Sequence, residues 1–261
     1  MGEFLETKFE KMGARVKVMS LPDRLFRGPV RIDVRRDKHG EYFDVRHRSD
    51  VRVDVIDVKP SDRHLLLMAR DADDVKSKFL CGHDERAWFV AAVPETAHAA
   101  NVQAAKDALK PQAVWAAIRQ HGVRAKYRDR RRTTAFVRQG EWFFIPRPRL
   151  RVTESLVLKN EPIRRGAGKP HMCQSLYRVG GEAVHVHDDY PNGLTHRQFL
   201  ELRPSVRNAK GWRLMVRDAH AYVKGSVRHP DHATVWLDVW HEVVMNTETQ
   251  AVAMRNVAFL D

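Results

Sequence analysis

Histidine and carboxylate side chains that could bind a metal ion are concentrated in the last third of the chain. Eight of the 14 histidines lie between residues 171 and 261. His185 and His187 are two positions apart, so they would project from the same face of a strand, and Asp189 follows closely. Two histidines and one carboxylate are a common ligand set for zinc, manganese or iron. The pattern therefore predicts a candidate metal site.

A second candidate metal site combines His229 and His232 with His241 on the following strand. The segment 228–232, Arg-His-Pro-Asp-His, also has the composition of a hairpin turn, which accounts for its histidines without a ligand role. No His-Glu-x-x-His helix supports either site. The turn interpretation is the stronger one, so we predict that no cofactor is required and keep a divalent metal as the alternative.

A carboxylate-x-lysine pattern, which positions a divalent cation in many nucleases, occurs at Asp57-Val58-Lys59. Asp23 or Asp44 would have to supply the second carboxylate. Such a short pattern arises by chance in many chains of this length. The sequence also lacks a Gly-x-Ser-x-Gly nucleophile elbow, so we assign no catalytic residue.

The most unusual feature is a run of basic residues at positions 124–132, with the sequence RAKYRDRRR. Six cations and one tyrosine fall within nine residues, and arginine dominates. A guanidinium group can bind a phosphate through two hydrogen bonds or stack on a base. The predicted nucleic-acid contacts, taken from this run and the basic residues after it, are Arg124, Lys126, Tyr127, Arg128, Arg130, Arg131, Arg132, Arg138, Trp142, Arg164, Arg165 and Lys169.

The distribution of charge supports a local binding surface. The formal net charge is +13, and residues 111–170 hold 15 basic against four acidic residues, a net +11. Residues 1–110 have a net charge of +2, and residues 171–261 have none. A solvated face usually mixes the two signs, whereas this segment does not. We therefore expect a polyanion, most simply nucleic acid, to bind there.

Aromatic residues near the run bear on which nucleic acid would bind. Trp142 and Phe144 would face one side of a strand and Phe143 the other. One set must enter the core, and exposure of the other would favour RNA or single-stranded DNA over duplex DNA. The alternatives are a metal-dependent hydrolase or nuclease that uses the C-terminal histidines, and a scaffold subunit that docks on an acidic protein.

The elements that would position these residues are mostly strands. Alternating apolar residues predict strands between about 30 and 70, with turns at His39-Gly40 and Ser49-Asp50. Helices are expected over 3–12, twice within 95–121, and over 195–203. Prolines and glycines indicate a loop at 159–170. Further strands are expected at 78–93, 135–145, 172–178, 182–187, 212–217, 221–228 and 233–244.

These elements predict an α+β fold made predominantly of antiparallel β hairpins and meanders, with a helical pair near 95–121 and a short helix near 195–203. We expect an N-terminal β-rich domain over 1–165, which carries the basic segment, and a histidine-rich β domain over 166–261; one composite domain is the alternative. The hairpins at 79–94 and 136–146 share a polar turn followed by Trp-Phe, which suggests an internal repeat.

The sequence also bounds the cellular setting. Cys81 and Cys173 stand 92 positions apart without a CxxC pair, which argues against a disulfide framework and favours a reducing cytoplasm. The first residues lack the basic and apolar regions of a signal peptide, and the apolar runs are too short to cross a bilayer. We expect a cytoplasmic protein with no membrane partner.

Overall fold

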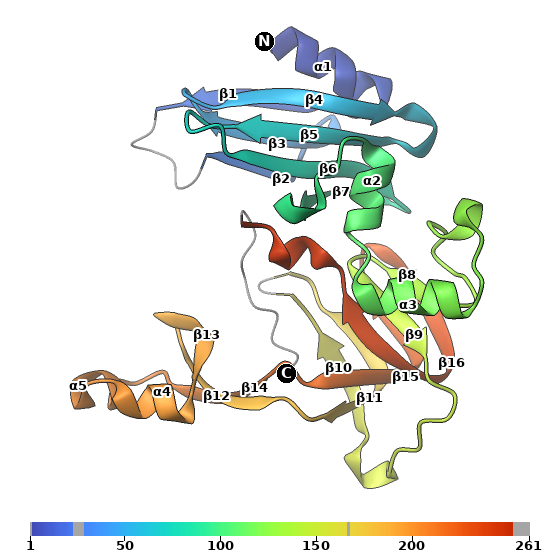
Figure 1. Ribbon diagram of the computed structural model, residues 1–261, viewed down its shortest axis with the longest axis vertical. Coiled ribbons are helices and arrows are strands. Elements are labelled where there is room, and N and C mark those ends of the chain that lie inside the picture. The colour runs from blue at the N-terminus through green and yellow to red at the C-terminus, as the bar shows by residue number, and fades with distance from the viewer. Residues whose placement is uncertain (1, 23–28, 166–167, 253–261) are drawn as a thin grey trace. The chain divides into compact units, whose positions relative to one another are not determined.

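The computed structural model describes residues 2–22, 29–165 and 168–252 and shows a mainly β protein with a few short helices (Figure 1). The chain forms two compact units. Of the described residues, the first unit holds those within 2–111 and 246–252, and the second holds those within 112–245. Within the described residues, no helix is long and apolar enough to span a membrane. The division differs from the boundary expected near 165, because strands from both sides of that point share one sheet.

The first unit begins with a helix and a three-stranded sheet in the order β1-β3-β2. The helix α1 ends at Lys11, two residues before Gly13, which has a positive φ of 81° and stops the helix from continuing. Strand β1 pairs with β3 in parallel, and β2 pairs with β3 through a tight turn. The elements are α1 (Gly2–Lys11), β1 (Val16–Leu21), β2 (Val30–Asp37) and β3 (Gly40–Arg48).

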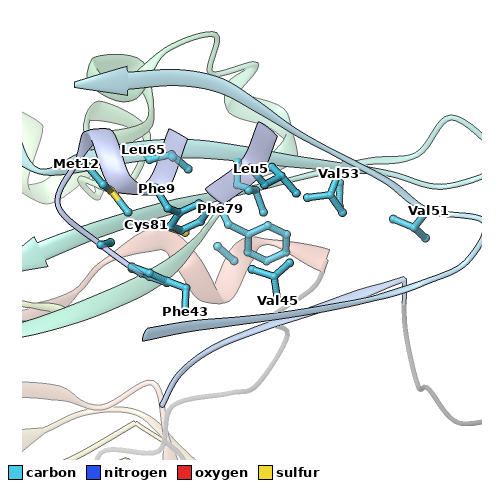
Figure 2. Packing of buried hydrophobic residues seen from close by; sticks show 14 of the residues in the cluster. Leu5, Phe9, Met12, Phe43, Val45, Val51, Val53, Leu65, Phe79 and Cys81 are labelled. Carbon is cyan, nitrogen blue, oxygen red and sulfur yellow. The ribbon is translucent and has the colours of Figure 1, made fainter. Parts of the chain in front are cut away.

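A four-stranded antiparallel meander, in the order β4-β5-β6-β7, forms the second sheet of this unit. One face packs with α1, β1, β2 and β3 around Phe9, Phe43, Leu65 and Phe79, as Figure 2 shows. The opposite face packs against α2 through Leu66 and Leu80. The elements are β4 (Arg52–Lys59), β5 (His64–Arg70), β6 (Lys76–Asp84), β7 (Ala87–Val93), α2 (Val102–Ala108) and η6 (Thr247–Gln250).

The second unit is built on a six-stranded antiparallel sheet in the order β10-β11-β15-β16-β9-β8. The strands are β8 (Val137–Gln139), β9 (Trp142–Pro146), β10 (Leu158–Ile163), β11 (His171–Val179), β15 (His220–His229) and β16 (His232–Met245). The sheet curls strongly, because Gln139 in β8 contacts His171 in β11 although three strands lie between them in the sheet order. Its inner face encloses one apolar core around Trp142, Phe144 and Leu176.

A helix covers part of the outer face of this sheet. Helix α3 (Gln112–Gln120) packs Val114 and Ile118 against Phe143 and Ile145 of β9. Between the neighbouring strands β11 and β15 the chain makes an excursion with its own three-stranded sheet, in the order β13-β12-β14. The excursion comprises β12 (Glu182–His187), β13 (Tyr190–Thr195), α4 (His196–Glu201), α5 (Pro204–Arg207) and β14 (Arg213–Arg217).

Two local expectations are wrong. The segment 159–170 is not a loop throughout, because β10 extends to Ile163; Pro162 is tolerated there since β10 lies at the edge of its sheet. Ser49-Asp50 does not close a hairpin, because β3 and β4 belong to different sheets. The hairpins at 79–94 and 136–146 do form, and each begins its turn with a positive φ, at Glu85 and Gly140.

Candidate nucleic-acid interface

The arginine run, residues 124–132, follows α3 and includes the short helix η4 (Ala125–Tyr127). The Tyr127 ring lies near two of the cations: Arg130 Cζ is 4.2 Å and Lys126 Nζ is 4.9 Å from its centroid. Arg128 lies over Trp115 of α3, with Cζ 5.6 Å from the ring centroid. Cation–π contacts of this kind contribute about 0.5–1 kcal/mol at exposed sites. They order the run without neutralising its charge.

The cations of this run differ from those of the first unit in their surroundings. Arg124, Lys126, Arg130 and Arg132 are exposed, and none forms an ion pair with an acidic side chain in the described part of the chain. In the first unit, by contrast, basic side chains repeatedly meet aspartates. The pairs there include Arg15–Asp37, Lys17–Asp37, Arg35–Asp44, Arg48–Asp50, Arg52–Asp54, Lys59–Asp62 and Lys106–Asp62. Four such exposed cations within nine residues of sequence are thus concentrated in the run.

The environment of Asp37 shows how completely charge is balanced in the first unit. Its carboxylate accepts hydrogen bonds from Arg15 and Lys17 at 2.8 to 2.9 Å, and these contacts hold the pKa of Asp37 well below its usual range. The same contacts raise the pKa of Arg15 and of Lys17. Cations held in this way are less available to an external phosphate than those of the arginine run.

The remaining predicted contacts lie in other parts of the second unit. Arg138 donates to the carbonyl of Gly140 at 3.1 Å. Lys169 Nζ lies 2.8 Å from a carboxylate oxygen of Asp231, so its charge is compensated. Arg164 is exposed and forms no ion pair with a described acidic residue, whereas Arg165 acts electrostatically on Glu141. Part of the predicted set is thus engaged in local contacts, and the arginine run holds most of its exposed cations without a described acidic partner.

Trp142 cannot stack on a base in this structure. Its side chain is 1% exposed and belongs to the inner core of the six-stranded sheet, together with Phe144. Phe143, on the other face, is covered by α3. Both faces of β9 are therefore buried, because a helix packs on one and the curled sheet closes over the other. We leave Trp142 out of the proposed interface.

Two tryptophans that the sequence analysis did not select line an open part of the outer sheet face. Trp236 is 66% exposed, and Trp240 is partly buried against Tyr177, with ring centroids 6.5 Å apart. They line a groove of about 610 Å³, which we call the outer-face groove. Lys224 and Gly225 lie beside them, and Arg151 comes from the segment between β9 and β10. The alternation Val235-Trp236-Leu237-Asp238 could have revealed the exposed tryptophan, because its apolar neighbours point inward.

The arginine run and the outer-face groove are joined directly. Arg132 Nη2 donates a hydrogen bond of 3.0 Å to the main-chain carbonyl of Trp236, although 104 residues separate the two in sequence. Arg132 also forms an isolated β-bridge with Val137, which ties the end of the run to β8. The contact holds a cation at the main chain of a residue with an exposed aromatic side chain, and cations together with exposed aromatic residues are found in proteins that bind single strands.

Three histidines meet at the other end of the β15–β16 hairpin. His229 and His232 face each other across the turn, which confirms the expected hairpin, and both stack near His171 of β11. The His171 and His229 ring centroids are 4.2 Å apart. Gln139 donates to the carbonyls of Val227 and Ala233, so its oxygen accepts from His171 Nδ1 at 3.0 Å. His171 was not among the predicted residues.

The electrostatics of this histidine cluster follow from burial and proximity. Burial and the neighbouring His171 and His232 lower the pKa of His229 to about 4. Glu141 lies 3.7 Å from His171 Nε2. Burial, the largest single influence, opposes ionisation of Glu141, but contacts with His171, with its own main chain and with the charge of Arg165 together hold the pKa of this carboxyl below its ordinary value. His229 Nδ1 accepts from the Asp231 amide, which places the proton of neutral His229 on Nε2. That tautomer does not offer Nε2 as a metal ligand.

The predicted metal ligands are not assembled as expected. His241 pairs with Val223, nine positions beyond His232 along β16, and its Nδ1 contacts the carbonyl of Val239. His187 uses both ring nitrogens, with the Asp189 amide and the Lys210 carbonyl. His185 instead contacts His196 at 3.1 Å. Among the residues that the structure describes, no three His, Cys, Asp or Glu side chains are grouped to hold a metal ion. A metal stays a prediction.

The nuclease pattern at Asp57-Val58-Lys59 has local structural roles. Asp57 accepts a hydrogen bond of 2.8 Å from the Val102 amide at the start of α2. Lys59 pairs with Asp62 at 3.0 Å, and Asp44 lies between Arg35 and Arg46. Asp23 lies outside the described residues. The described members of this pattern are thus engaged in contacts that stabilise the first unit.

The chain was also compared with known proteins. No protein-family model, curated protein or solved structure matches it.

Proposed function

We propose that this protein binds nucleic acid, with the arginine run of the second unit contacting backbone phosphates. The observation that carries the proposal is the exposed positive charge of Arg124, Lys126, Arg130 and Arg132, which no described acidic side chain neutralises. Many basic residues elsewhere in the described chain are paired with aspartates or glutamates at short range. Nucleic acid supplies the missing negative charges at regular intervals.

The chemistry of the run fits phosphate rather than a specific base pattern. Arginine provides a planar set of donors that matches two phosphate oxygens, and the stacked Tyr127 keeps two of the cations near one another. Phosphate contacts fix position and give affinity but carry no sequence information. The proposed binding is therefore salt-dependent and has little base specificity.

Fluorescence anisotropy of the full chain with labelled 20-nucleotide RNA, single-stranded DNA and duplex DNA tests the proposal. We expect binding at about 50 mM salt that weakens steeply by 200 mM. The absence of binding to all three probes at low salt would overturn the proposed function. Equal binding of a polyglutamate competitor, with no preference for nucleic acid, would point to an acidic protein partner and would also contradict it.

A further inference from the structure

We propose that the outer-face groove binds an unpaired nucleic-acid strand by stacking a base on Trp236. The inference rests on the proposed function and specifies its substrate class, because an exposed ring in a groove can stack only on a base that is not already enclosed in a duplex. A volume of about 610 Å³ is within the size range of small-ligand sites, so the groove can accept bases individually.

Trp236 has the exposure that stacking requires. It is 66% exposed, while its strand neighbours Val235 and Leu237 are buried in the core at 8% and 2%. The neighbours anchor the main chain, and the carbonyl of Trp236 is held by Arg132. The indole therefore projects into solvent from a fixed main chain, and it takes no part in packing of the core. Trp240, partly buried on the same wall of the groove, offers a second aromatic surface.

Strand pairing beside the groove is irregular, and one position there requires glycine. The pairing of β15 with β16 shifts register between Val223 and Gly225, and that of β11 with β15 shifts between Cys173 and Ser175. Gly225 has φ +87°, and a Cβ there would lie 2.5 Å from Gln174 Oε1. Adjacent bulges of this kind bend strands and re-aim side chains next to functional sites.

The charges around the groove suit a strand that continues from the arginine run. Arg151 and Lys224 are exposed at the groove and form no ion pair with a described acidic residue. Lys159 is paired with Glu154 at 3.3 Å. Asp238 also lines the groove and accepts from the Val239 amide, a contact that leaves its negative charge in place, so the two cations outnumber one carboxylate. In the proposed complex, one phosphate of the strand contacts Arg132 and a later one contacts Lys224 or Arg151. The base between these two phosphates enters the groove.

The test compares Trp236→Ala, Trp236→Phe and Phe4→Ala in the full chain. Phe4 is a matched control because it is an exposed aromatic residue of the first unit, 59% exposed. Dissociation constants are measured by anisotropy for a 12-nucleotide RNA, the same sequence as single-stranded DNA, and a duplex DNA. Circular dichroism and melting of each variant confirm that it is folded.

We expect Trp236→Ala to weaken binding of both single strands by about 5- to 150-fold, the loss that corresponds to one base–aromatic stack. Trp236→Phe should retain most of the affinity that Trp236→Ala loses, and Phe4→Ala should leave the dissociation constants unchanged. Duplex binding and the salt slope should stay the same in Trp236→Ala, because no phosphate contact is removed. A loss confined to RNA or to DNA would contradict recognition through the base.

The two proposals fail in different ways. If the unmodified chain binds none of the probes, the proposed function itself is wrong. If it binds them but prefers the duplex, or if Trp236→Ala binds single strands as tightly as the unmodified chain does, only the groove is wrong. In that second case the arginine run would remain the interface.

Discussion

Removing three exposed cations from the arginine run should reduce the salt dependence of nucleic-acid binding by a calculable amount. The variant Arg124→Ala, Lys126→Ala, Arg130→Ala removes side chains that have no described acidic partner, so it leaves no buried charge uncompensated. Each phosphate contact on a single strand contributes about 0.7 to the slope of log K against log salt. Loss of three contacts should make the slope shallower by about 2.

The consequence is measurable over a modest range of salt. When salt is raised from 50 to 200 mM, both proteins should lose affinity. The factor by which the unmodified chain loses it should be about 20 times the factor for the triple variant. The assay is anisotropy with a labelled 20-nucleotide RNA at five salt concentrations, and the slope is read from a double-logarithmic plot. Melting temperatures should change little, because the lost cation–π contacts with Tyr127 are exposed.

A second triple variant controls for net charge. Lys11→Ala, Arg36→Ala, Lys38→Ala removes the same three charges from exposed positions of the first unit. It should leave the slope within about 0.5 of the unmodified value, since the proposed phosphate contacts are made by the second unit and none of them is removed. If both variants reduce the slope equally, binding depends on net charge and not on the arginine run, and our reasoning about the run is refuted.

Three further predictions concern the fold around the histidine cluster and the cysteines. Because the pKa of His229 is about 4 in the folded chain and about 6.5 when unfolded, the unfolded state binds more protons between these values. The free energy of unfolding should therefore fall by about 1–2 kcal/mol as the pH drops from 6.5 to 4, a value reduced to allow for the partial solvent exposure of His229. In His229→Gln the melting temperature should depend less on pH within that window. Gln139→Leu should cost about 2–4 kcal/mol in urea unfolding, because it leaves His171 and two carbonyls without their partner. Burial raises the pKa of Cys81 above its ordinary range and that of Cys173 to about 12, so neither thiol should react with Ellman's reagent until the chain unfolds.

Local patterns in the sequence were sufficient for many elements. The apolar spacing of residues 3–12 predicts α1, and the expected strands at 172–178, 182–187 and 221–228 correspond to β11, β12 and β15. Turn chemistry located the hairpin between His229 and His232, because a Pro-Asp pair there favours a tight turn. These features depend on neighbours in sequence, which is why one chain reveals them.

Pairing between distant segments could not be derived in this way. The parallel contact of β1 with β3 and the return of residues 246–252 to the first unit depend on long-range packing. The burial of Trp142 has the same origin, because the choice between the two faces of β9 is made by α3 and by the curl of the sheet. His171 was missed because β8 and β11 meet only through that curl.

The location of the interface is tested most directly by ultraviolet crosslinking of the full chain to a single-stranded RNA, followed by mass spectrometry of the crosslinked peptides. We predict that crosslinks concentrate in peptides that contain residues 124–132 and Trp236, and that they disappear as salt is raised to 500 mM. Crosslinks that fall mainly in residues 2–111, where many basic side chains are paired with aspartates, would contradict the account.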